Sequence, residues 1–167
     1  MKTFKIYLIL LAFTSTIAKA QFSKAELQIS GLNCGLCAKT TETSLRALPF
    51  VSDVKPDLMH NIYNITFKQN QPVNFDQIGQ IVKKENFFVN SLKATFNFDK
   101  VKIVQNSFSY DGDTYRVMNA KDKSLSGPVM VTIIDKGFAP RSVSKKYLGQ
   151  IAVIEQANSR RVYHVAI

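Results

Sequence analysis

The sequence is short of the residues on which several protein classes depend. Its 167 residues include no tryptophan, two cysteines and two histidines. We recognise in it no serine, histidine and acid combination of the kind that nucleophilic hydrolases use, no paired carboxylates and no glycine-rich phosphate loop. These absences exclude the common hydrolase and nucleotide-binding designs, and we expect the protein not to be an enzyme.

Long hydrophobic runs are missing as well. Residues 6–13 form an apolar run of eight residues, whereas a membrane-spanning helix needs about 20. This run follows the basic segment 1–5 and precedes residues 18–20 (Ala-Lys-Ala), which have the small-x-small pattern of a cleavage site. We therefore expect residues 1–20 to be a signal peptide, and the mature protein to be soluble and exported, with no membrane span. The leader looks bacterial, and we expect the periplasm of a Gram-negative bacterium.

Positive charge is in excess and is unevenly spread. Lys and Arg number 22 against 12 acids, and three of the lysines belong to the leader, which leaves the mature chain near +7. Residues 98–167 carry eleven basic and six acidic residues. A basic half can indicate nucleic acid or an anionic surface, but an exported protein rarely meets nucleic acid, so we expect no nucleic-acid partner and an ordinary solvated face.

Both cysteines fall in one short motif, residues 31–37 (Gly-Leu-Asn-Cys-Gly-Leu-Cys). It follows the alternating run 25–29 and precedes the helix-like run 38–48, which places Cys34 and Cys37 on a turn from a strand into a helix. Two thiols at a helix start can point at one small volume, and the helix N-terminus favours their thiolate forms. This arrangement suits Cu(I), Zn(II) or Hg(II), and it equally suits a reversible disulfide.

The hydrophobic pattern predicts six elements up to residue 98. The expected strands are 25–30, 51–57, 62–67 and 87–96, and the expected helices are 38–48 and 75–85. The order strand, helix, strand, strand, helix, strand is that of a ferredoxin-like βαββαβ sandwich, with four antiparallel strands and two helices on one face.

In residues 24–98 this order, together with a glycine, an apolar residue and C-x-x-C at the first strand-to-helix turn, resembles the heavy-metal-associated domain. Copper chaperones, modules of copper-exporting ATPases and the periplasmic mercury-binding protein share that domain. The resemblance implies metal binding at Cys34 and Cys37, and it weighs against a thioredoxin-like redox role, for which a longer sheet and an aromatic residue before the first cysteine are expected.

Two positions depart from the family pattern. Leu32 stands where the family usually has methionine, and we expect it to pack under the cysteine loop in the same way. Phe87 and Phe88 stand where the family has glycine followed by tyrosine or phenylalanine near the metal loop, so the aromatic residue is kept and the glycine is lost.

The chain beyond residue 98 has a different character. Short strands are expected at 101–104, 107–110, 114–118, 129–134, 151–154 and 162–167, with turns between them. They predict a small all-β barrel or sandwich domain, 99–167, of a family that we do not recognise. No linker rich in glycine or serine separates it from the domain 21–98, so we expect the two units to abut and the second to fold independently.

Other metal donors are few. His60 lies in a turn that we expect to be away from the cysteine loop, and His164 lies in the last strand. Met118 and Met130 are expected on apolar strands as core residues. Lys39, two residues after Cys37, is expected to be a surface lysine.

The sequence thus indicates an exported protein that binds metal through Cys34 and Cys37. Cu(I) is the expected ion because two thiolates give it a nearly linear site, whereas Zn(II) wants two further ligands. The expected role is a Cu(I) chaperone or sequestering protein, a monomer that meets a metal-donor or metal-acceptor protein. The alternative is an envelope interaction or adaptor module whose two cysteines form a disulfide and bind no metal.

Overall fold

The computed structural model describes residues 21–99, 101–119, 125–148 and 161–167. Its elements are β1 (Phe22–Ser30), α2 (Gly35–Arg46), β2 (Val51–Asp57), β3 (Ile62–Phe67), α3 (Phe75–Lys84), β4 (Phe88–Asn97), β5 (Ser107–Tyr110), β6 (Asp113–Val117), β7 (Pro128–Ile133), α4 (Arg141–Leu148) and β8 (Val162–Ala166). The predicted leader and the predicted strand 151–154 lie outside the described residues. Among the described helices, none has the length and apolar character needed to cross a bilayer.

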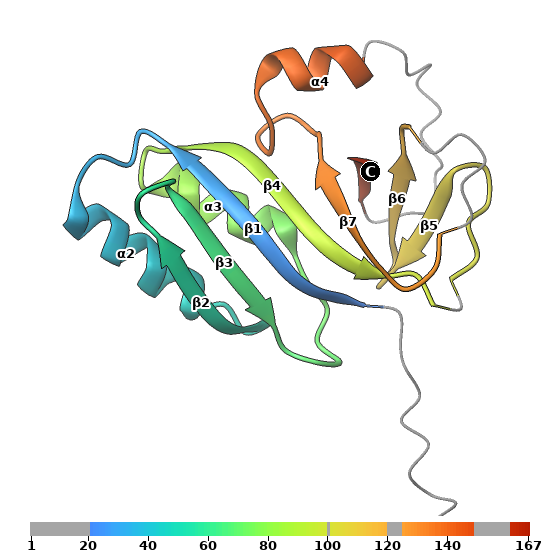
Figure 1. Ribbon diagram of the computed structural model, residues 1–167, viewed down its shortest axis with the longest axis horizontal. Helices are drawn as coiled ribbons and strands as arrows, with labels where there is room; N and C mark the ends of the chain where they lie inside the picture. The colour runs from blue at the N-terminus through green and yellow to red at the C-terminus, as the bar shows by residue number, and fades with distance from the viewer. Residues whose placement is uncertain (1–20, 100, 120–124, 149–160) are drawn as a thin grey trace, which may run out of the picture.

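The first six elements form the expected βαββαβ unit. Alternate residues of β1 are buried, and α3 buries Phe75, Ile78 and Val82 at intervals of three and four, as an amphipathic helix does. Asn74 caps α3 because its side chain accepts a hydrogen bond from the backbone N–H of Gln77 at 3.1 Å. Helices α2 and α3 lie against the same face of these strands (Figure 1). The α+β class predicted from the sequence is confirmed.

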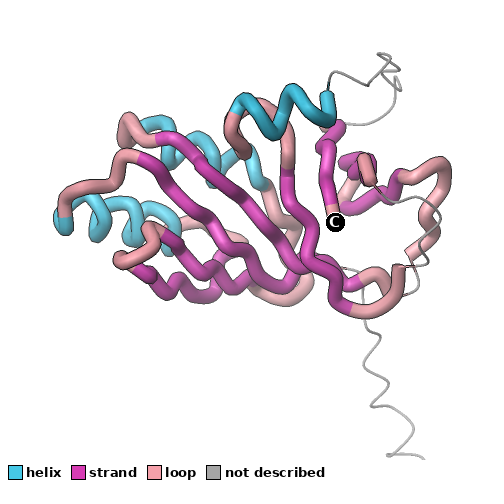
Figure 2. The backbone as a smooth tube through the Cα atoms, turned by 45° about the horizontal axis from the view of Figure 1, so that its top comes forward, coloured by secondary structure: helices cyan, strands magenta, loops and turns pink. Residues whose placement is uncertain are grey.

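The eight strands in the described residues belong to one sheet, in the order β2-β3-β1-β4-β7-β8-β6-β5. Neighbouring strands are antiparallel except β6 and β8, which run parallel. The pairing of β4 with β7, in which Ala94 faces Val131 and Phe96 faces Val129, joins the βαββαβ unit to the later strands. The tube drawing follows this twisted sheet from β2 across to the later strands (Figure 2).

The later part differs in detail from the small all-β unit that the sequence predicts. The expected strand 101–104 does not form; these residues contribute to β pairing only the isolated bridge between Val104 and Ser107. A helix that the sequence pattern did not predict, α4, begins directly after Pro140, where the backbone carbonyl of Pro140 accepts hydrogen bonds from Val143 and Ser144 at 3.0 Å. Proline is favoured at a helix start, because the N–H that it lacks would have no partner within the helix.

One hydrophobic core spans both sides of residue 98. Phe22 of β1 lies with its ring centroid 5.3 Å from that of Tyr115 of β6, and Phe96 of β4 lies 4.6 Å from Phe108 of β5. The aromatic cluster is formed by the buried or half-buried rings of Phe22, Phe75, Phe96, Phe98, Phe108, Tyr110, Tyr115 and Tyr163. The boundary at residue 98 therefore marks the end of the βαββαβ unit and does not divide two cores. Independent folding of residues 99–167 stays an untested prediction of the sequence, whereas the shared core leads us to expect that this fragment alone has low stability.

Tyr115 occupies the middle of this aromatic cluster. Its ring stacks on Phe108 at 5.1 Å and on Tyr163 at 5.1 Å. Among the described residues its hydroxyl has no hydrogen-bond partner, and burial raises the pKa of the phenol. An unpartnered buried hydroxyl costs about 1–3 kcal/mol, which the contacts of the ring must offset.

Candidate metal site

The two cysteines meet at the start of α2, as the sequence predicts. Cys34 is the N-cap residue of the helix, and its Sγ accepts a hydrogen bond from the backbone N–H of Cys37 at 3.1 Å. The Cα atoms of the pair are 5.3 Å apart and the two sulfur atoms are joined in a disulfide. Cys34 is exposed and Cys37 is half-buried against the core. The first turn of α2 has no acidic residue, so on reduction the partial positive charge of the helix end favours a thiolate at Cys34.

The loop before Cys34 is held by two features of the chain. Gly31 has φ +90°, a conformation that favours glycine, and a Cβ added to it would lie 3.6 Å from Cδ1 of Phe87. Leu32 is only 8% exposed and packs in the core below the loop, as expected for the position where the resemblance implies a methionine. The loop therefore rests on side chains rather than on the disulfide alone.

The two phenylalanines after α3 take different roles. Phe87 is half-buried beside Gly31, whereas Phe88 is 75% exposed. The left-handed residue at this helix end is Asn86, with φ 61°, and the backbone N–H of Phe87 then bonds to the carbonyl of Val82 at 3.0 Å. Asparagine tolerates this conformation, so the chain turns here without the glycine of the family pattern.

Helix α2 is tied to the sheet by buried and charged contacts. The buried hydroxyl of Tyr63 on β3 donates to the carbonyl of Ala38 at 3.0 Å. Arg46 contacts Glu42 at 2.9 Å and Asp53 of β2 at 2.7 Å, and it also bonds to the carbonyl of Val54. Hydrogen bonds from Arg46 and then Lys39 hold the pKa of Glu42 below its ordinary value. These contacts fix the helix whose N-terminus carries the cysteines.

Lys39 is a surface residue, as expected. Its Nζ lies 3.0 Å from Oε2 of Glu42 and its side chain is 69% exposed. The lysine therefore compensates the charge of Glu42. The positive charge that favours a thiolate at Cys34 is the partial charge of the helix N-terminus.

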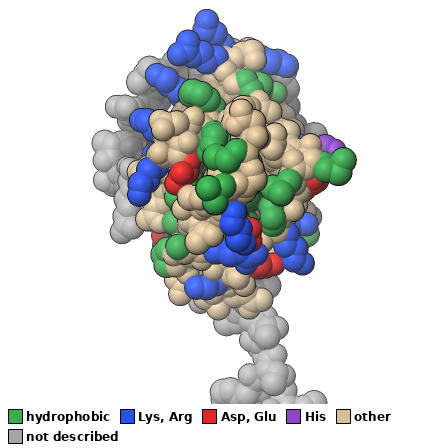
Figure 3. Space-filling view, turned by 90° about the vertical axis from the view of Figure 1, so that its left-hand side faces the viewer, with side chains coloured by type: hydrophobic (Ala, Val, Ile, Leu, Met, Phe, Trp, Pro, Cys, Tyr) green, Lys and Arg blue, Asp and Glu red, His purple; other side chains and the backbone are tan. Residues whose placement is uncertain are grey.

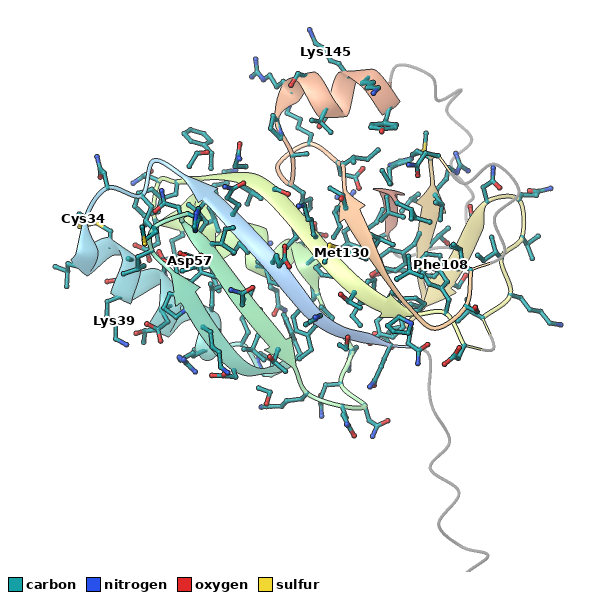
Figure 4. The ribbon with its side chains drawn as sticks, in the orientation of Figure 1. Cys34, Lys39, Asp57, Phe108, Met130 and Lys145 are labelled. Carbon is teal, nitrogen blue, oxygen red and sulfur yellow. A yellow bond between two sulfur atoms is a disulfide. The ribbon has the colours of Figure 1, made fainter. Side chains whose placement is uncertain are left out.

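The position predicted for His60 is wrong. The backbone N–H of Ile29, at the end of β1, donates to the carbonyl of Asn61 at 3.0 Å, and the side chain of Gln28 reaches the carbonyl of His60 at 3.3 Å. The β2–β3 turn therefore lies at the same end of the sheet as the cysteine loop (Figure 4). The physical reason is chain direction: α2 runs away from the cysteines, so β2 must run back towards them.

The remaining donors are scattered. His164 on β8 is half-buried, with Nδ1 2.8 Å from Oδ1 of Asp135. Met118 is half-buried beyond β6, and Met130 on β7 is 42% exposed, so the expectation that Met130 fills the core is wrong. No group of three or more His, Cys, Asp or Glu side chains in the described residues is arranged to hold a metal. Cys34 and Cys37 are therefore the soft donors that the described structure brings together.

Exposed apolar side chains gather at the cysteine end of the molecule. Leu36 is 79% exposed, Phe88 75%, Leu58 56% and Met59 91%. The view of this end shows hydrophobic side chains over its middle with charged side chains around them (Figure 3). Four exposed apolar residues, from the start of α2, the β2–β3 turn and the start of β4, give this end the character of a contact surface.

Comparisons with solved structures found similarity to several metal-handling proteins. The yeast copper transporter domain Ccc2a, solved in the apo and Cu(I)-loaded states, is 29% identical over 39% of this chain and 88% of that chain, with a TM-score of 0.35. The CopZ metallochaperone is 19% identical over 40% of this chain and 98% of its own, with a TM-score of 0.37. The N-terminal soluble domains of CopA from Bacillus subtilis are 17% identical over 80% and 92% of the two chains, with a TM-score of 0.39. A search of curated protein sequences gave no match.

The family model gives the assignment itself. Residues 26–88, from β1 to the first residue of β4, match the model of the heavy-metal-associated domain. They include the cysteine loop, both helices of the βαββαβ unit and the turn at His60. This segment of the chain is a heavy-metal-associated domain.

Proposed function

We propose that the mature protein is an exported copper-binding protein that holds one Cu(I) between the thiolates of Cys34 and Cys37. It passes the ion to other proteins or sequesters it from them. The observation that carries the proposal is the placement of both sulfur atoms at the exposed N-terminus of α2, with Cα atoms 5.3 Å apart. The heavy-metal-associated domain and the similarity to the yeast copper transporter domain Ccc2a, solved in the apo and Cu(I)-loaded states, support it.

The number of donors favours Cu(I) or Hg(II) over Zn(II), and the similarity to the Cu(I)-loaded yeast domain favours Cu(I). Cu(I) and Hg(II) are satisfied by two thiolates in a nearly linear arrangement, whereas Zn(II) in proteins is held by four ligands or by three and water. Within the described residues no third or fourth ligand lies with the pair. Transfer then requires a partner thiol to approach the open side of the ion, which the exposure of Cys34 permits.

The disulfide sets a condition on binding. Two electrons and two protons convert the bridge into two thiols, and the thiols lose their protons when the ion binds. An exported protein works in a compartment where such pairs tend to close. The metal must therefore arrive after a reductant has opened the bridge, or already bound to the thiolates of a donor protein.

The test is Cu(I) binding by the reduced mature chain under anaerobic conditions. We expect one tightly bound Cu(I) per chain, with only sulfur neighbours in X-ray absorption spectra. Cys34→Ser or Cys37→Ser should abolish tight binding, and Met130→Leu, which removes a sulfur far from the pair, should leave it unchanged. Nitrogen or oxygen neighbours in the wild-type spectrum, or tight binding by either serine variant, would contradict the proposal.

A second candidate function keeps the disulfide. The bridged pair of the structure, together with the basic residues Arg141, Lys145 and Lys146 on α4, favours an adaptor that binds an acidic partner at the cell envelope. Thiol alkylation of protein taken directly from cells separates the two functions. A pair that stays fully oxidised with and without copper in the medium would favour the adaptor.

Location and assembly belong to the same proposal. We infer export to the periplasm from the leader, no enzymatic activity, and a monomer that meets donor or acceptor proteins. N-terminal sequencing of the mature protein should begin at Gln21, and the protein should be found in the periplasmic fraction. Light scattering should give the mass of a single chain.

A further inference from the structure

The β2–β3 turn presents two exposed donors that the cysteine site does not use. Met59 is 91% exposed, and the side chain of His60 is 67% exposed. A methionine at a turn tip with almost no contact to the core gains little from packing. What it offers at that position is a thioether sulfur, a soft ligand for copper.

Asp57 holds the imidazole of His60 in one orientation. Its Oδ2 lies 2.8 Å from Nδ1 of His60, and its Oδ1 accepts the backbone N–H groups of Met59 at 3.2 Å and His60 at 3.3 Å. The hydrogen bond to His60 lowers the pKa of Asp57. Because a carboxylate only accepts, Nδ1 carries the proton and the lone pair of Nε2 in the neutral ring is left for another partner.

This arrangement is the one that metal-binding histidines use. A histidine ligand commonly donates its other ring N–H to a carboxylate, which fixes the tautomer and raises the basicity of the metal-binding nitrogen. In the described part of the chain no hydrogen bond engages Nε2 of His60. His164 has the same carboxylate contact with Asp135, but it is only 16% exposed, so of the two pairs the turn pair is the accessible one.

We propose that Sδ of Met59 and Nε2 of His60 form a second, weaker binding site for Cu(I). Two donors leave the ion room for a third ligand, and neither donor is oxidised when Cys34 and Cys37 form a disulfide. The turn lies at the cysteine end of the sheet, held to β1 by the Ile29 to Asn61 hydrogen bond of 3.0 Å. The site therefore retains copper at this end of the molecule while the thiols are closed.

The experiment uses the full mature chain with Cys34→Ser and Cys37→Ser, so that its outcome does not depend on the thiolate site. Ag(I), which has the same d10 configuration and is redox-inert, is titrated in chloride-free buffer and followed by NMR. We expect the ε-methyl signal of Met59 and the ring signals of His60 to shift together and saturate at one equivalent. The same titration of the wild-type chain with its disulfide intact should give the same shifts.

Variants of the turn complete the test. Met59→Leu and His60→Gln should each weaken Ag(I) binding by about tenfold or more, and Asp57→Asn, which keeps an acceptor for the backbone, should weaken it by about tenfold through the ring orientation. The matched control is Met130→Leu, another exposed methionine, which should change nothing. Shifts centred on Met118 or Met130, an unchanged affinity in Met59→Leu, or no shift at all would overturn the proposal.

Discussion

The two ends of the sheet are built in opposite ways. At the cysteine end, the start of α2, the β2–β3 turn and the start of β4 carry exposed side chains such as Leu36, Met59 and Phe88. At the other end, rings from β1, α3, β4, β5, β6 and β8 close into the aromatic cluster. Strand β4 joins both ends, because Phe88 at its start is 75% exposed and Phe96 near its end is fully buried. The residues that stabilise the core and the residues of the candidate metal site therefore lie at different ends of the sheet. Substitutions at the site can then leave the packing of the core unchanged.

The largest expected effect is that of separating the two halves of the sheet. A fragment of residues 99–167 loses the pairing of β7 with β4 and the contacts of Phe108 and Tyr115 with Phe96 and Phe22. We expect it to unfold at a much lower urea concentration than the full chain, as followed by circular dichroism. A fragment as stable as the full chain would show that residues 99–167 are a domain of their own.

The two phenylalanines of β4 give the sharpest comparison of the ends. Phe96→Ala removes a buried ring that contacts Phe22, Phe98 and Phe108, and we expect a loss of about 3–5 kcal/mol in the free energy of unfolding. Phe88→Ala should change it by about 0.5 kcal/mol or less, because an exposed side chain has little packing to lose. Urea denaturation of both variants measures the difference. Equal losses in the free energy of unfolding would contradict the contrast between the exposed cysteine end and the buried aromatic cluster.

Acid should weaken the charged contacts that tie the C-terminal end of α2 to β2. Glu42 has a pKa below its ordinary value of 4.5, chiefly because of the hydrogen bond from Arg46. A lowered carboxyl pKa stabilises the fold above the ordinary value, and this contribution is lost as the pH falls through the lowered value. Wild type should therefore be more stable than Glu42→Gln at pH 7, and the difference in thermal midpoint should shrink below about pH 4.5. A difference that stays constant with pH would contradict this assignment.

The smallest expected effect belongs to the phenol in the aromatic cluster. Tyr115→Phe keeps the stacked ring and removes the buried hydroxyl, which has no partner among the described residues. We expect an unchanged free energy of unfolding or a gain of up to about 1 kcal/mol. A clear loss in urea denaturation would reveal a hydrogen bond to this hydroxyl.

Local patterns predicted the first half of the chain well. Alternation in β1 and β3, the spacing of Phe75, Ile78 and Val82 in α3, and Pro49 after α2 are signals within a few residues of the element that they specify. The cysteine pair at the strand-to-helix turn was predicted for the same reason. Each of these features depends on neighbours in the sequence.

The errors concern features that depend on distant parts of the chain. The pairing of β4 with β7 joins residues such as Ala94 and Val131, and no pattern within either strand identifies its partner. Helix α4 has few apolar residues, so periodicity did not reveal it, although Pro140 before it is a helix-start signal. The position of His60 could have been derived by following the direction of β2 after α2. That step would have placed a histidine and a methionine beside the cysteine loop from the sequence alone.

The pairing of β4 with β7 has a further consequence for behaviour at high concentration. A four-stranded unit that ended at β4 would leave the ten residues of that strand as an open edge with unpaired backbone groups, which is a template for edge-to-edge aggregation. Among the described strands the edges are instead β2, which contains Pro56 and Lys55, and β5, which has four residues. Proline and lysine discourage a further strand, and four residues offer few hydrogen bonds. The later strands therefore also guard the protein against self-association through β4.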